Sequence, residues 1–355
     1  MRKGFTTGAA ATAAAKAAAI LLAGSQGSKV RNRRLTGFVE IELPDSKKLC
    51  LKIHNSELLT RNSELMARAS VIKDAGDDPD VTNGMEIRAE VGILEHTEDI
   101  EIKGGEGVGV VTKPGLQIPV GESAINPVPA EMIKKAVREV LPKGGIAVEI
   151  SVPGGREVAG KTFNQRLGIV GGISIIGTTG IVEPMSLEAL KATIRCEIDV
   201  AWEEVRSASS ALFLAPGKIG ENALKRLFGD IRVVQMSNFV GFALEYAREK
   251  GIESIVIGGH PGKLAKIMMG YFDTHSGNSP QATGFVAEFL GLNGEFNTVE
   301  EIIQSLRMDS GTGQTFFDLA AGIAEAVRGR FGFRTVEVCL FDMKKGLTGR
   351  GKCTG

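Results

Sequence analysis

A run of glycines and threonines near the middle of the chain has the residue types of a ligand-binding loop. Gly177-Thr178-Thr179-Gly180 follows an apolar stretch, residues 167–176, that predicts a buried strand interrupted by glycines. Glycines let a backbone approach a ligand closely, and threonines offer hydroxyl groups without charge. We expect a helix to begin at Ser186, with Glu188 in its first turn, and a helix start favours anionic groups. The alternative is a tight turn between two core elements.

A second glycine-rich segment, Gly258-Gly259-His260-Pro261-Gly262-Lys263, has some features of a phosphate-binding P-loop. However, Leu264 stands where a P-loop has the Ser or Thr that binds magnesium, and the glycine spacing is short. We therefore expect this backbone to hold another anion, such as a carboxylate, in preference to a nucleoside triphosphate. His260 in this segment and His275 beyond it are candidate proton-transfer residues, and a structural role is the alternative for each.

Four aspartates, Asp74, Asp77, Asp78 and Asp80, lie close together in one loop. This loop lacks the twelve-residue calcium-binding pattern and its closing glutamate. Three interpretations remain open: a site for a hard cation, a solvated turn whose carboxylates cap backbone amides, or a loop that contacts a ligand. In the last case, Asp77 or Asp78 would accept a hydrogen bond from the ligand or act as a base.

The composition argues against several classes of function. The 42 basic and 42 acidic residues of this 355-residue chain balance, whereas nucleic-acid-binding proteins usually have a basic surplus. The four cysteines form no CxxC pair, which argues against a structural zinc or iron–sulfur site. Scattered cysteines are typical of a reducing compartment, so we expect a cytoplasmic protein. No GxSxG motif supports a hydrolase triad, and no stretch of ~20 apolar residues predicts a membrane span.

The first half of the chain, residues 1–157, predicts an α+β domain. Its alanine-rich segment predicts a helix over 8–23, with Thr6 or Thr7 as N-cap and Gly24 at its end. Lys16 lies within this run, so the segment is not a secretory signal. Apolar patterns predict strands at 37–43, 48–53, 85–93 and 145–152 and a helix at 130–140. The glycines of 104–109 lead into a strand-like run, so they do not form a dinucleotide-binding turn.

The second half, residues 158–355, predicts a three-layer α/β domain with a mainly parallel sheet, and further crossings between the halves stay open. Apolar runs at 211–214, 231–234 and 254–257 alternate with helices at 221–228, 239–250 and 263–269. Ligands of such sheets bind at the carboxyl ends of the strands, here Pro216-Gly217, Ser237-Asn238 and Gly258-Gly259-His260. Helices at 299–307 and 314–331, a strand at 334–341 and a frayed tail from Lys344 complete the prediction.

Together, these segments resemble one family, the cobalt-precorrin-5B C1-methyltransferases of the anaerobic cobalamin pathway. The resemblance extends from residue 2 to about residue 342. It rests on long runs in a fixed order: RKGFTTG from Arg2, KDAGDDPDVTNG from Lys73, GGEGVGVVTKPGL from Gly104, PVGESAINPVP from Pro119, KTFNQRLGIVGGISIIGTTGIVEPMS from Lys161, QMSNFVG from Gln235, GGHPGKLAK from Gly258 and THS from Thr274. The family often has a cysteine shortly after Thr-Thr-Gly, where this chain has Ala9-Ala10-Ala11, so that thiol is not essential here.

The resemblance implies transfer of a methyl group from S-adenosyl-L-methionine to ring carbon C1 of cobalt-precorrin-5B, which gives cobalt-precorrin-6A. Cobalt would arrive with this tetrapyrrole substrate, so we expect no metal site in the protein. The reaction requires the S–CH₃ bond to be aligned with the ring carbon, and such positioning supplies much of the catalysis. The acetate and propionate arms of the macrocycle require Lys, Arg and backbone N–H groups.

The matching runs and the predicted strand ends supply the candidate site residues. Those for the methyl donor are Gly177, Thr178, Thr179, Gly217, Ser237, Asn238, Gly258 and Gly259. Those for the macrocycle are Lys3, Thr6, Thr7, Asp78, Lys161, Arg166 and Lys263, and those for catalysis are Asp77, His260 and His275. We expect the first domain on the substrate side, the second on the donor side, and the macrocycle between the two halves.

Two other functions remain open at this stage. The glycine-rich loops alone fit an α/β enzyme that acts on a different nucleotide-linked or phosphorylated small molecule. A non-catalytic tetrapyrrole carrier would bind a corrinoid, but it would not need the second set of strand-end loops. The expected partner is the tetrapyrrole itself, without nucleic acid or membrane. A homo-oligomer and transient contact with neighbouring pathway enzymes are both open.

Overall fold

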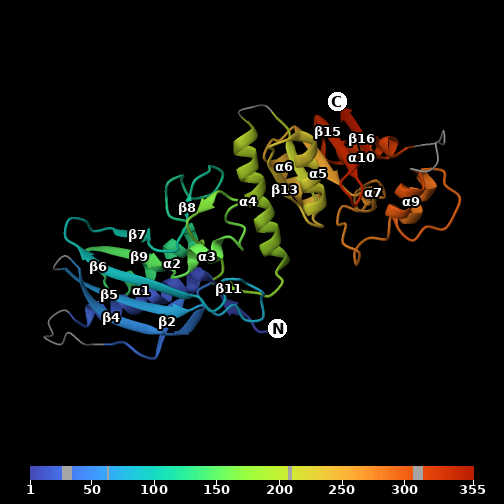
Figure 1. The fold of residues 1–355 in the computed structure, drawn as a ribbon. Coiled ribbons are helices and arrows are strands. Elements are labelled where there is room, and N and C mark those ends of the chain that lie inside the picture. The colour runs from blue at the N-terminus through green and yellow to red at the C-terminus, as the bar shows by residue number, and fades with distance from the viewer. Residues whose placement is uncertain (26–33, 62–63, 207–209, 307–314) are drawn as a thin grey trace. The chain divides into compact units, whose positions relative to one another are not determined.

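A computed structural model of the protein describes residues 1–25, 34–61, 64–206, 210–306 and 315–355. The chain forms two compact units, Met1–Ser186 and Leu187–Gly355 (Figure 1). The predicted boundary after residue 157 is thereby moved to residue 186. The physical reason is strand pairing, because β10 (Ile169–Val170) and β11 (Ile181–Val182) both pair with strands of the first unit.

The first unit contains a sheet with strand order β4-β5-β6-β9-β7. Its strands are β4 (Asn55–Arg61), β5 (Glu64–Ile72), β6 (Glu86–Leu94), β9 (Gly145–Ser151) and β7 (Ile100–Gly104). Neighbours are antiparallel except β7 and β9, which are parallel. Alternate residues of β6, such as Ile87, Ala89 and Val91, are fully buried, as the period of a half-buried strand requires. The strand predicted at 85–93 is therefore confirmed.

Helix α1 (Thr7–Ala23) lies at the centre of the first unit's core. Its alanines from Ala9 to Ala19 are completely buried, because such small side chains let the sheet, α2 (Pro127–Arg138) and β2 (Phe38–Glu42) all pack closely around it. Strand β3 (Lys48–Lys52) pairs with β2. The Thr6 hydroxyl caps α1 by accepting a hydrogen bond from the Ala9 N–H at 3.1 Å, and Gly24 is the C-cap. The prediction of a capped helix is confirmed.

Short ladders complete the first unit. Strand β1 (Gly4–Phe5) pairs with β11, β8 (Val110–Val111) pairs with β10, and the short helix α3 (Gly155–Ala159) follows β9. The prediction of a buried strand over 167–176 is wrong for most of its length, since only β10 is a strand there. Val170 and Ile176 are 49% and 50% exposed, and the glycines between them leave isolated bridges instead of a ladder.

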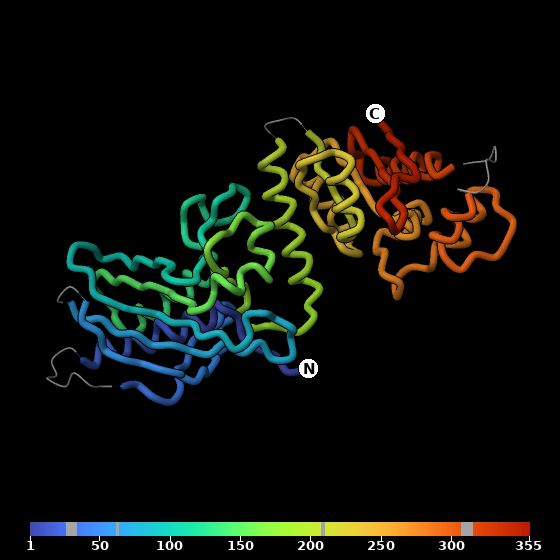
Figure 2. Tube along the Cα trace, in the orientation of Figure 1, coloured from blue at the N-terminus to red at the C-terminus, as the bar shows by residue number. Residues whose placement is uncertain are grey.

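The second unit contains a sheet with strand order β13-β12-β14-β15-β16. Its strands are β12 (Leu212–Ala215), β13 (Val233–Gln235), β14 (Ser254–Gly259), β15 (Thr335–Phe341) and β16 (Leu347–Thr354). The first four strands run parallel, as predicted, and β16 is antiparallel to β15. The prediction of a frayed tail is therefore wrong. The C-terminal segment, red in Figure 2, is an edge strand because its backbone pairs with β15.

Helices cover both faces of this sheet and produce the expected three layers. On one face lie α4 (Leu187–Val205), α6 (Val240–Glu249), α7 (Pro261–Met268) and α10 (Phe316–Phe331), and α8 (Thr283–Phe289) and α9 (Val299–Leu306) pack beside α7. On the other face α5 (Lys218–Phe228) covers a smaller apolar cluster. The helices predicted at 299–307 and 314–331 are confirmed, although residues 307 and 314 lie outside the described residues.

Within the described part of the chain, no helix is both long enough and apolar enough to cross a bilayer.

Candidate active site

The carboxyl ends of the parallel strands in the second unit form the candidate active site. From β12 the chain passes through α5 to β13 on one side, and then through α6 to β14 on the other side of β12. The direction of winding therefore reverses between β12 and β14. In open α/β sheets, ligands bind just outside the strand ends at such a switch point. The loops at this point begin with Pro216-Gly217 and His260.

Contacts between loops bring several predicted residues to this edge. The Thr274 N–H donates to the Asn238 carbonyl at 3.0 Å, so the loop after α7 lies against the end of β13. The Pro216 ring lies beside Gly259, with its Cδ 3.2 Å from the position that a Cβ on Gly259 would occupy. The structure thus gathers the segments of Gly217, Asn238, Gly259 and His275, which are far apart in the sequence, at one edge of one sheet.

Two predicted glycines at this edge have different surroundings. Gly217 has an extended backbone (φ −179°), and an added Cβ would meet nothing within 4 Å. No side chain caps α5 at Gly217, so no capping hydroxyl or carboxylate occupies the start of this helix. Gly258, in contrast, faces α5, where an added Cβ would overlap the buried side chain of Leu224. The packing of α5 on the sheet therefore explains Gly258.

Ser237 has a strained backbone directly after β13. Its φ of 52° lies in the left-handed region, which costs a residue with a side chain about 1–2 kcal/mol. Its side chain makes no hydrogen bond to any described residue, so no local bond compensates for the strain. Strained backbone of this kind is concentrated at ligand-binding sites. Ser46 has a comparable φ of 64° in a surface turn, so the strain at Ser237 supports the ligand-binding interpretation only together with its place at a strand end.

The two candidate histidines differ in their free ring nitrogens. His260 Nδ1 accepts a hydrogen bond from the Gly262 N–H at 3.1 Å, which leaves the proton on Nε2, and Nε2 donates to the Glu300 carboxylate at 3.2 Å. Both nitrogens of His260 are therefore occupied. His275 is exposed, and its Nδ1 accepts from the Gly277 N–H at 3.0 Å. Its Nε2 has no partner among the described residues.

Two lysines place positive charge beside this edge. Burial and the neighbouring Lys266 ammonium lower the pKa of Lys263, and Asp273 opposes them only in part. Lys266 is buried, and it donates to the Thr274 carbonyl at 3.2 Å and the Ser279 hydroxyl at 3.0 Å. Neither ammonium has an ion pair with a described carboxylate. This arrangement would favour a bound carboxylate.

In the first unit, the aspartates of the acidic loop are held by internal partners. Asp74 forms an ion pair with the Arg2 guanidinium, and Asp77 accepts from the Arg2 backbone N–H at 2.6 Å. Asp78 accepts from the Met185 N–H at 3.1 Å. Three His, Cys, Asp or Glu side chains that could share a metal ion occur nowhere in the described ranges. The interpretation of the loop as a turn that caps backbone amides thus has direct geometric support.

The remaining aspartate of this loop neutralises a buried lysine. The Lys73 side chain is 1% exposed, and its ammonium lies 2.5 Å from the Asp80 carboxylate. Burial would raise the pKa of Asp80, but the Lys73 ammonium and hydrogen bonds from Thr82 outweigh it and hold that pKa below its ordinary value. Asp80 therefore remains charged, and its role is to pair with Lys73.

The threonine candidates of the first unit divide into buried and exposed pairs. Thr6 caps α1, and Thr7 accepts a hydrogen bond from the Ile176 N–H at 2.9 Å. Both are buried, so their hydroxyls serve the junction between α1 and the 174–176 segment. Thr178 and Thr179 are exposed, and Gly177 packs against Thr6.

The cationic candidates of the first unit lie near its surface. Lys3 is exposed and forms an ion pair with Glu183, and the ammonium of Lys161 is exposed without a partner among the described residues. Arg166 is half-buried and has an interaction partner. Of these three cations, Lys161 is thus the one whose charge is not engaged within the described protein.

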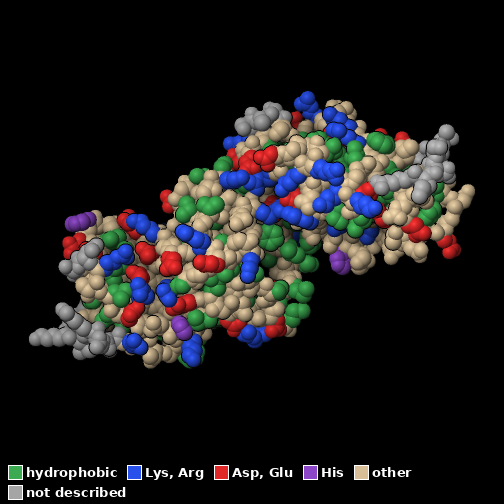
Figure 3. All heavy atoms as spheres, viewed as in Figure 1, with side chains coloured by type: hydrophobic (Ala, Val, Ile, Leu, Met, Phe, Trp, Pro, Cys, Tyr) green, Lys and Arg blue, Asp and Glu red, His purple; other side chains and the backbone are tan. Residues whose placement is uncertain are grey.

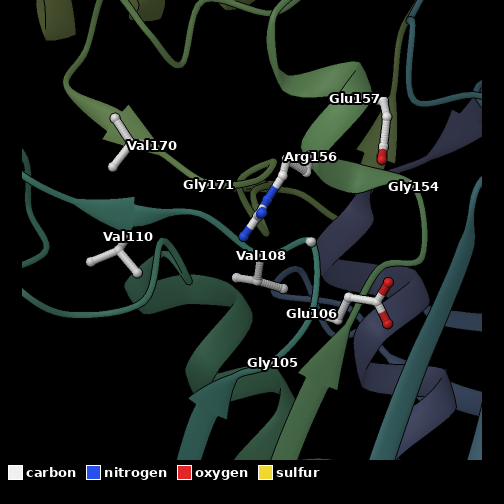
Figure 4. Close-up of a pocket in the computed structure, with 10 residues that line it drawn as sticks. Gly105, Glu106, Val108, Val110, Gly154, Arg156, Glu157, Val170 and Gly171 are labelled. Carbon is white, nitrogen blue, oxygen red and sulfur yellow. The ribbon is translucent and has the colours of Figure 1, made fainter.

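The first unit also contains a pocket that the sequence prediction missed. It encloses about 400 Å³, and its wall is made of Gly105, Glu106, Gly107, Val108, Val110, Gly154, Arg156, Glu157, Val170 and Gly171 (Figure 4). The glycines of 104–109 do not form a dinucleotide-binding turn, because no helix follows them, yet their backbone forms one side of the pocket. The length of the glycine-rich run from Gly104 is the sequence feature that could have indicated this pocket. No sequence feature indicates Arg156, because it comes from the separate helix α3.

Sequence comparison decides the family. The profile of the CbiD family matches residues 1–184. The chain is 45% identical to the cobalt-precorrin-5B C(1)-methyltransferase of Desulfitobacterium hafniense (strain Y51), with 90% of this chain and 81% of that protein covered. The chain belongs to the CbiD family. The protein of the same name from Alkaliphilus metalliredigens (strain QYMF) is 41% identical, and the match includes 98% of this chain and 91% of that protein. The one from Methanocaldococcus jannaschii is 39% identical, and the match includes 98% of this chain and 95% of that protein.

A solved CbiD structure is also similar. The cobalamin biosynthesis protein (cbiD) from Archaeoglobus fulgidus, known from a crystal structure, has 29% sequence identity to this chain. The match includes 77% of this chain and 82% of that one, with a TM-score of 0.37.

CbiD membership confirms the family expected from the sequence runs. The CbiD profile ends at residue 184, close to the end of the first unit at Ser186, so it includes the acidic loop and the pocket. The two relatives that match 98% of the chain extend the similarity over the strand ends of the second unit. Both candidate regions therefore lie in parts of the chain shared with CbiD proteins.

Proposed function

We propose that this protein transfers a methyl group from S-adenosyl-L-methionine to C1 of cobalt-precorrin-5B in cobalamin biosynthesis, giving cobalt-precorrin-6A. The observation that carries this proposal is the similarity to proteins named cobalt-precorrin-5B C(1)-methyltransferase, at 39–45% identity over 90–98% of the chain. The alternative of an unrelated nucleotide-linked substrate loses its basis, because it depended on the glycine-rich loops alone.

We assign the methyl donor to the strand-end edge of the second unit. S-adenosyl-L-methionine supplies a methyl group on a positively charged sulfur and also carries a carboxylate. The residues at this edge fit such a molecule, since the Gly217 backbone is open, Ser237 is strained, and the ammonium of Lys263 has no ion pair with a described carboxylate. In this proposal, the α5 N–H groups orient the donor together with Lys263, which we reassign from the macrocycle to the donor because it lies at this edge. The methyl group of the donor points away from the sheet.

We assign the macrocycle to residues of the first unit. The macrocycle carries several carboxylate arms, and each one needs a cation or N–H groups. Lys161 supports the assignment, because its ammonium has no partner among the residues that the structure describes. The second unit, taken by itself, gathers Lys and Arg side chains over the part where α5, α6 and β13 are labelled (Figures 1 and 3), and such charge favours the carboxylate of the methyl donor.

Catalysis in this proposal comes mainly from alignment. The transfer moves the positive charge off sulfur, so a weakly polar, water-excluding site favours it and no strong acid or base is needed. Of the three residues proposed for proton transfer, His275 is retained, because its Nε2 is free among the described residues. Asp77 and His260 are proposed instead as positioning residues, since their polar atoms already hold Arg2, Gly262 and Glu300.

Anaerobic incubation with cobalt-precorrin-5B and S-adenosyl-L-methionine labelled with ¹³C in its methyl group tests the function. The expected product is one methyl group heavier, and NMR places the label at C1. A label on another ring carbon, or no transfer under conditions that keep the substrate reduced, would refute the proposal. Thermal shifts test the alternatives: stabilisation by S-adenosylhomocysteine supports a methyltransferase, a response to NAD or ATP supports a nucleotide enzyme, and a response to a corrinoid alone supports a carrier.

A further inference from the structure

We propose that the pocket of the first unit binds one carboxylate arm of the macrocyclic substrate, and that Arg156 is the residue that recognises it. This inference rests on the proposed function, because it requires a polycarboxylated ring as substrate. It names a residue outside the matching runs that first indicated the family.

The geometry of the pocket places a cation against an apolar wall. Figure 4 shows the Arg156 side chain reaching from α3 toward the space between Val108, Val110 and Val170. The pocket volume of about 400 Å³ is within the range of small-ligand sites but at its lower end. It therefore suits one arm and the adjoining ring edge better than an entire tetrapyrrole.

The guanidinium of Arg156 is available for a ligand. It forms no hydrogen bond or ion pair with any residue that the structure describes. The two acidic residues of the wall point elsewhere in Figure 4. The hydrogen-bonded Glu86 carboxylate is the main cause that raises the pKa of Arg88, and the Glu106 charge adds to it, so Glu106 acts toward Arg88. The Glu157 carboxylate lies over the backbone of Gly154. The positive charge at the valine side of the pocket is therefore not neutralised by any described residue.

The apolar wall favours a ring edge beside the carboxylate. Val110 and Val170 face each other across the β8–β10 ladder and are 39% and 49% exposed. Apolar surface left open in this way gains free energy when a ligand covers it. Exclusion of water also strengthens the ion pair with Arg156, and the planar guanidinium can bind a carboxylate through two hydrogen bonds. A carboxylate on an apolar ring satisfies both parts of the pocket.

The backbone of the pocket is held rigidly. An added Cβ on Gly107 would overlap the Val152 carbonyl oxygen, and the Ile173 N–H donates to the Gly107 carbonyl at 2.9 Å. Three segments, which contain Gly107, Gly155 and Gly172, are therefore in direct backbone contact. A rigid wall lowers the conformational cost of binding.

Calorimetry with two stable corrinoids tests the inference on the full chain. Cobyrinic acid presents free carboxylate arms, and cobinamide presents the same ring with amide arms. Arg156→Gln should weaken the binding of cobyrinic acid roughly tenfold to a hundredfold, because a charge-assisted hydrogen-bonded pair is lost. Arg156→Lys should be intermediate, since the charge remains without the two-pronged geometry. Lys143→Gln, which removes an exposed charge of the same unit without a described partner, is the matched control and should change neither affinity.

A direct probe of Arg156 accompanies the calorimetry. Phenylglyoxal modifies accessible arginines, and mass spectrometry of the peptide that contains Arg156 should show protection by cobyrinic acid but not by cobinamide. Equal affinity of Arg156→Gln and wild type for cobyrinic acid, or modification that cobyrinic acid does not slow, would overturn the inference. If methyl transfer to C1 proceeds while Arg156 fails both tests, the proposed function stands and this subsite alone is refuted.

Discussion

The two glycine-rich regions of this protein use the absence of a side chain in opposite ways. At Gly107 in the first unit and Gly258 in the second, the missing Cβ lets backbone or a helix approach closely. At Gly171 in the pocket and Gly217 at the sheet edge, an added Cβ would meet nothing. The comparison teaches that a glycine motif marks a ligand site only where the space beside it is open, and that property depends on the fold.

The largest expected effect separates packed from open glycines in the first unit. Gly107→Ala should lower the free energy of unfolding by about 3–4 kcal/mol, because the new methyl group overlaps the Val152 carbonyl and the backbone has a positive φ of 74°. Gly171→Ala, at φ 83° with open space around it, should cost only about 1 kcal/mol. Urea unfolding followed by circular dichroism measures both. Equal losses would remove the distinction between the two positions.

The next effect tests whether the acidic loop is structural. Asp80→Asn should destabilise the protein by about 3 kcal/mol at neutral pH, because it leaves the buried Lys73 ammonium unpaired. The folded-state pKa of Asp80 is lowered, so its contribution is complete above about pH 4, the ordinary carboxyl value, and disappears as the pH falls through the lower folded-state pKa. The difference in the free energy of unfolding between wild type and Asp80→Asn should therefore become smaller at acidic pH.

The matched control for Asp80 is an exposed pair in the same unit. Asp45 pairs with Lys47 on the surface, and Asp45→Asn should leave the unfolding midpoint nearly unchanged. Unfolding by urea at a series of pH values compares both variants with wild type. A pH-independent loss in Asp80→Asn would contradict the ion-pair explanation.

A smaller effect links backbone strain to donor binding at the sheet edge. Ser237→Gly should raise the free energy of unfolding by about 0.5 kcal/mol, since the relief of left-handed strain exceeds the added flexibility of the unfolded chain. The same variant should bind S-adenosylhomocysteine more weakly, because the hydroxyl and the fixed turn are lost. Ser46→Gly relieves similar strain at φ 64° in a surface turn and should leave this affinity unchanged. Equal affinities in the two variants would exclude Ser237 from the donor site.

The smallest effect on stability is expected at Gly217. Gly217→Ala should change the free energy of unfolding by less than about 0.5 kcal/mol, because the backbone is extended and the space is open. Its affinity for S-adenosylhomocysteine should nevertheless fall, since the added methyl group occupies the proposed donor space. Gly284→Ala, also in open space, serves as the control for calorimetry. Full affinity in Gly217→Ala would place the donor elsewhere.

Local patterns were enough to predict much of the fold. The alanine helix with its Thr6 cap, the strand at 85–93 and the alternating strands and helices of the second unit all follow from residue periodicity and turn chemistry. These features are decided by residues a few positions apart, so one sequence reports them. The long matching runs likewise identified the family.

Strand β16 shows why other elements could not be predicted. Its sequence, LTGRGKCT, has no apolar alternation and two glycines, which disfavour a strand. The structure makes it a strand because β15 supplies backbone partners, and because Gly349 and Gly351 let α10 approach where any Cβ would overlap its backbone. Long-range pairing therefore outweighs local preference at this edge.

The sequence alone determined the family, most elements and the loops that bear polar or small residues. Only the tertiary structure decided which of these groups are already engaged: Asp77, Asp78 and Asp80 have partners inside the first unit, whereas Gly217 and Arg156 face open space. The physical reason is that a side chain's chemistry is local, but its partners come from segments far away in the chain. Whether a charge or a glycine is free for a ligand is therefore settled only when those segments meet.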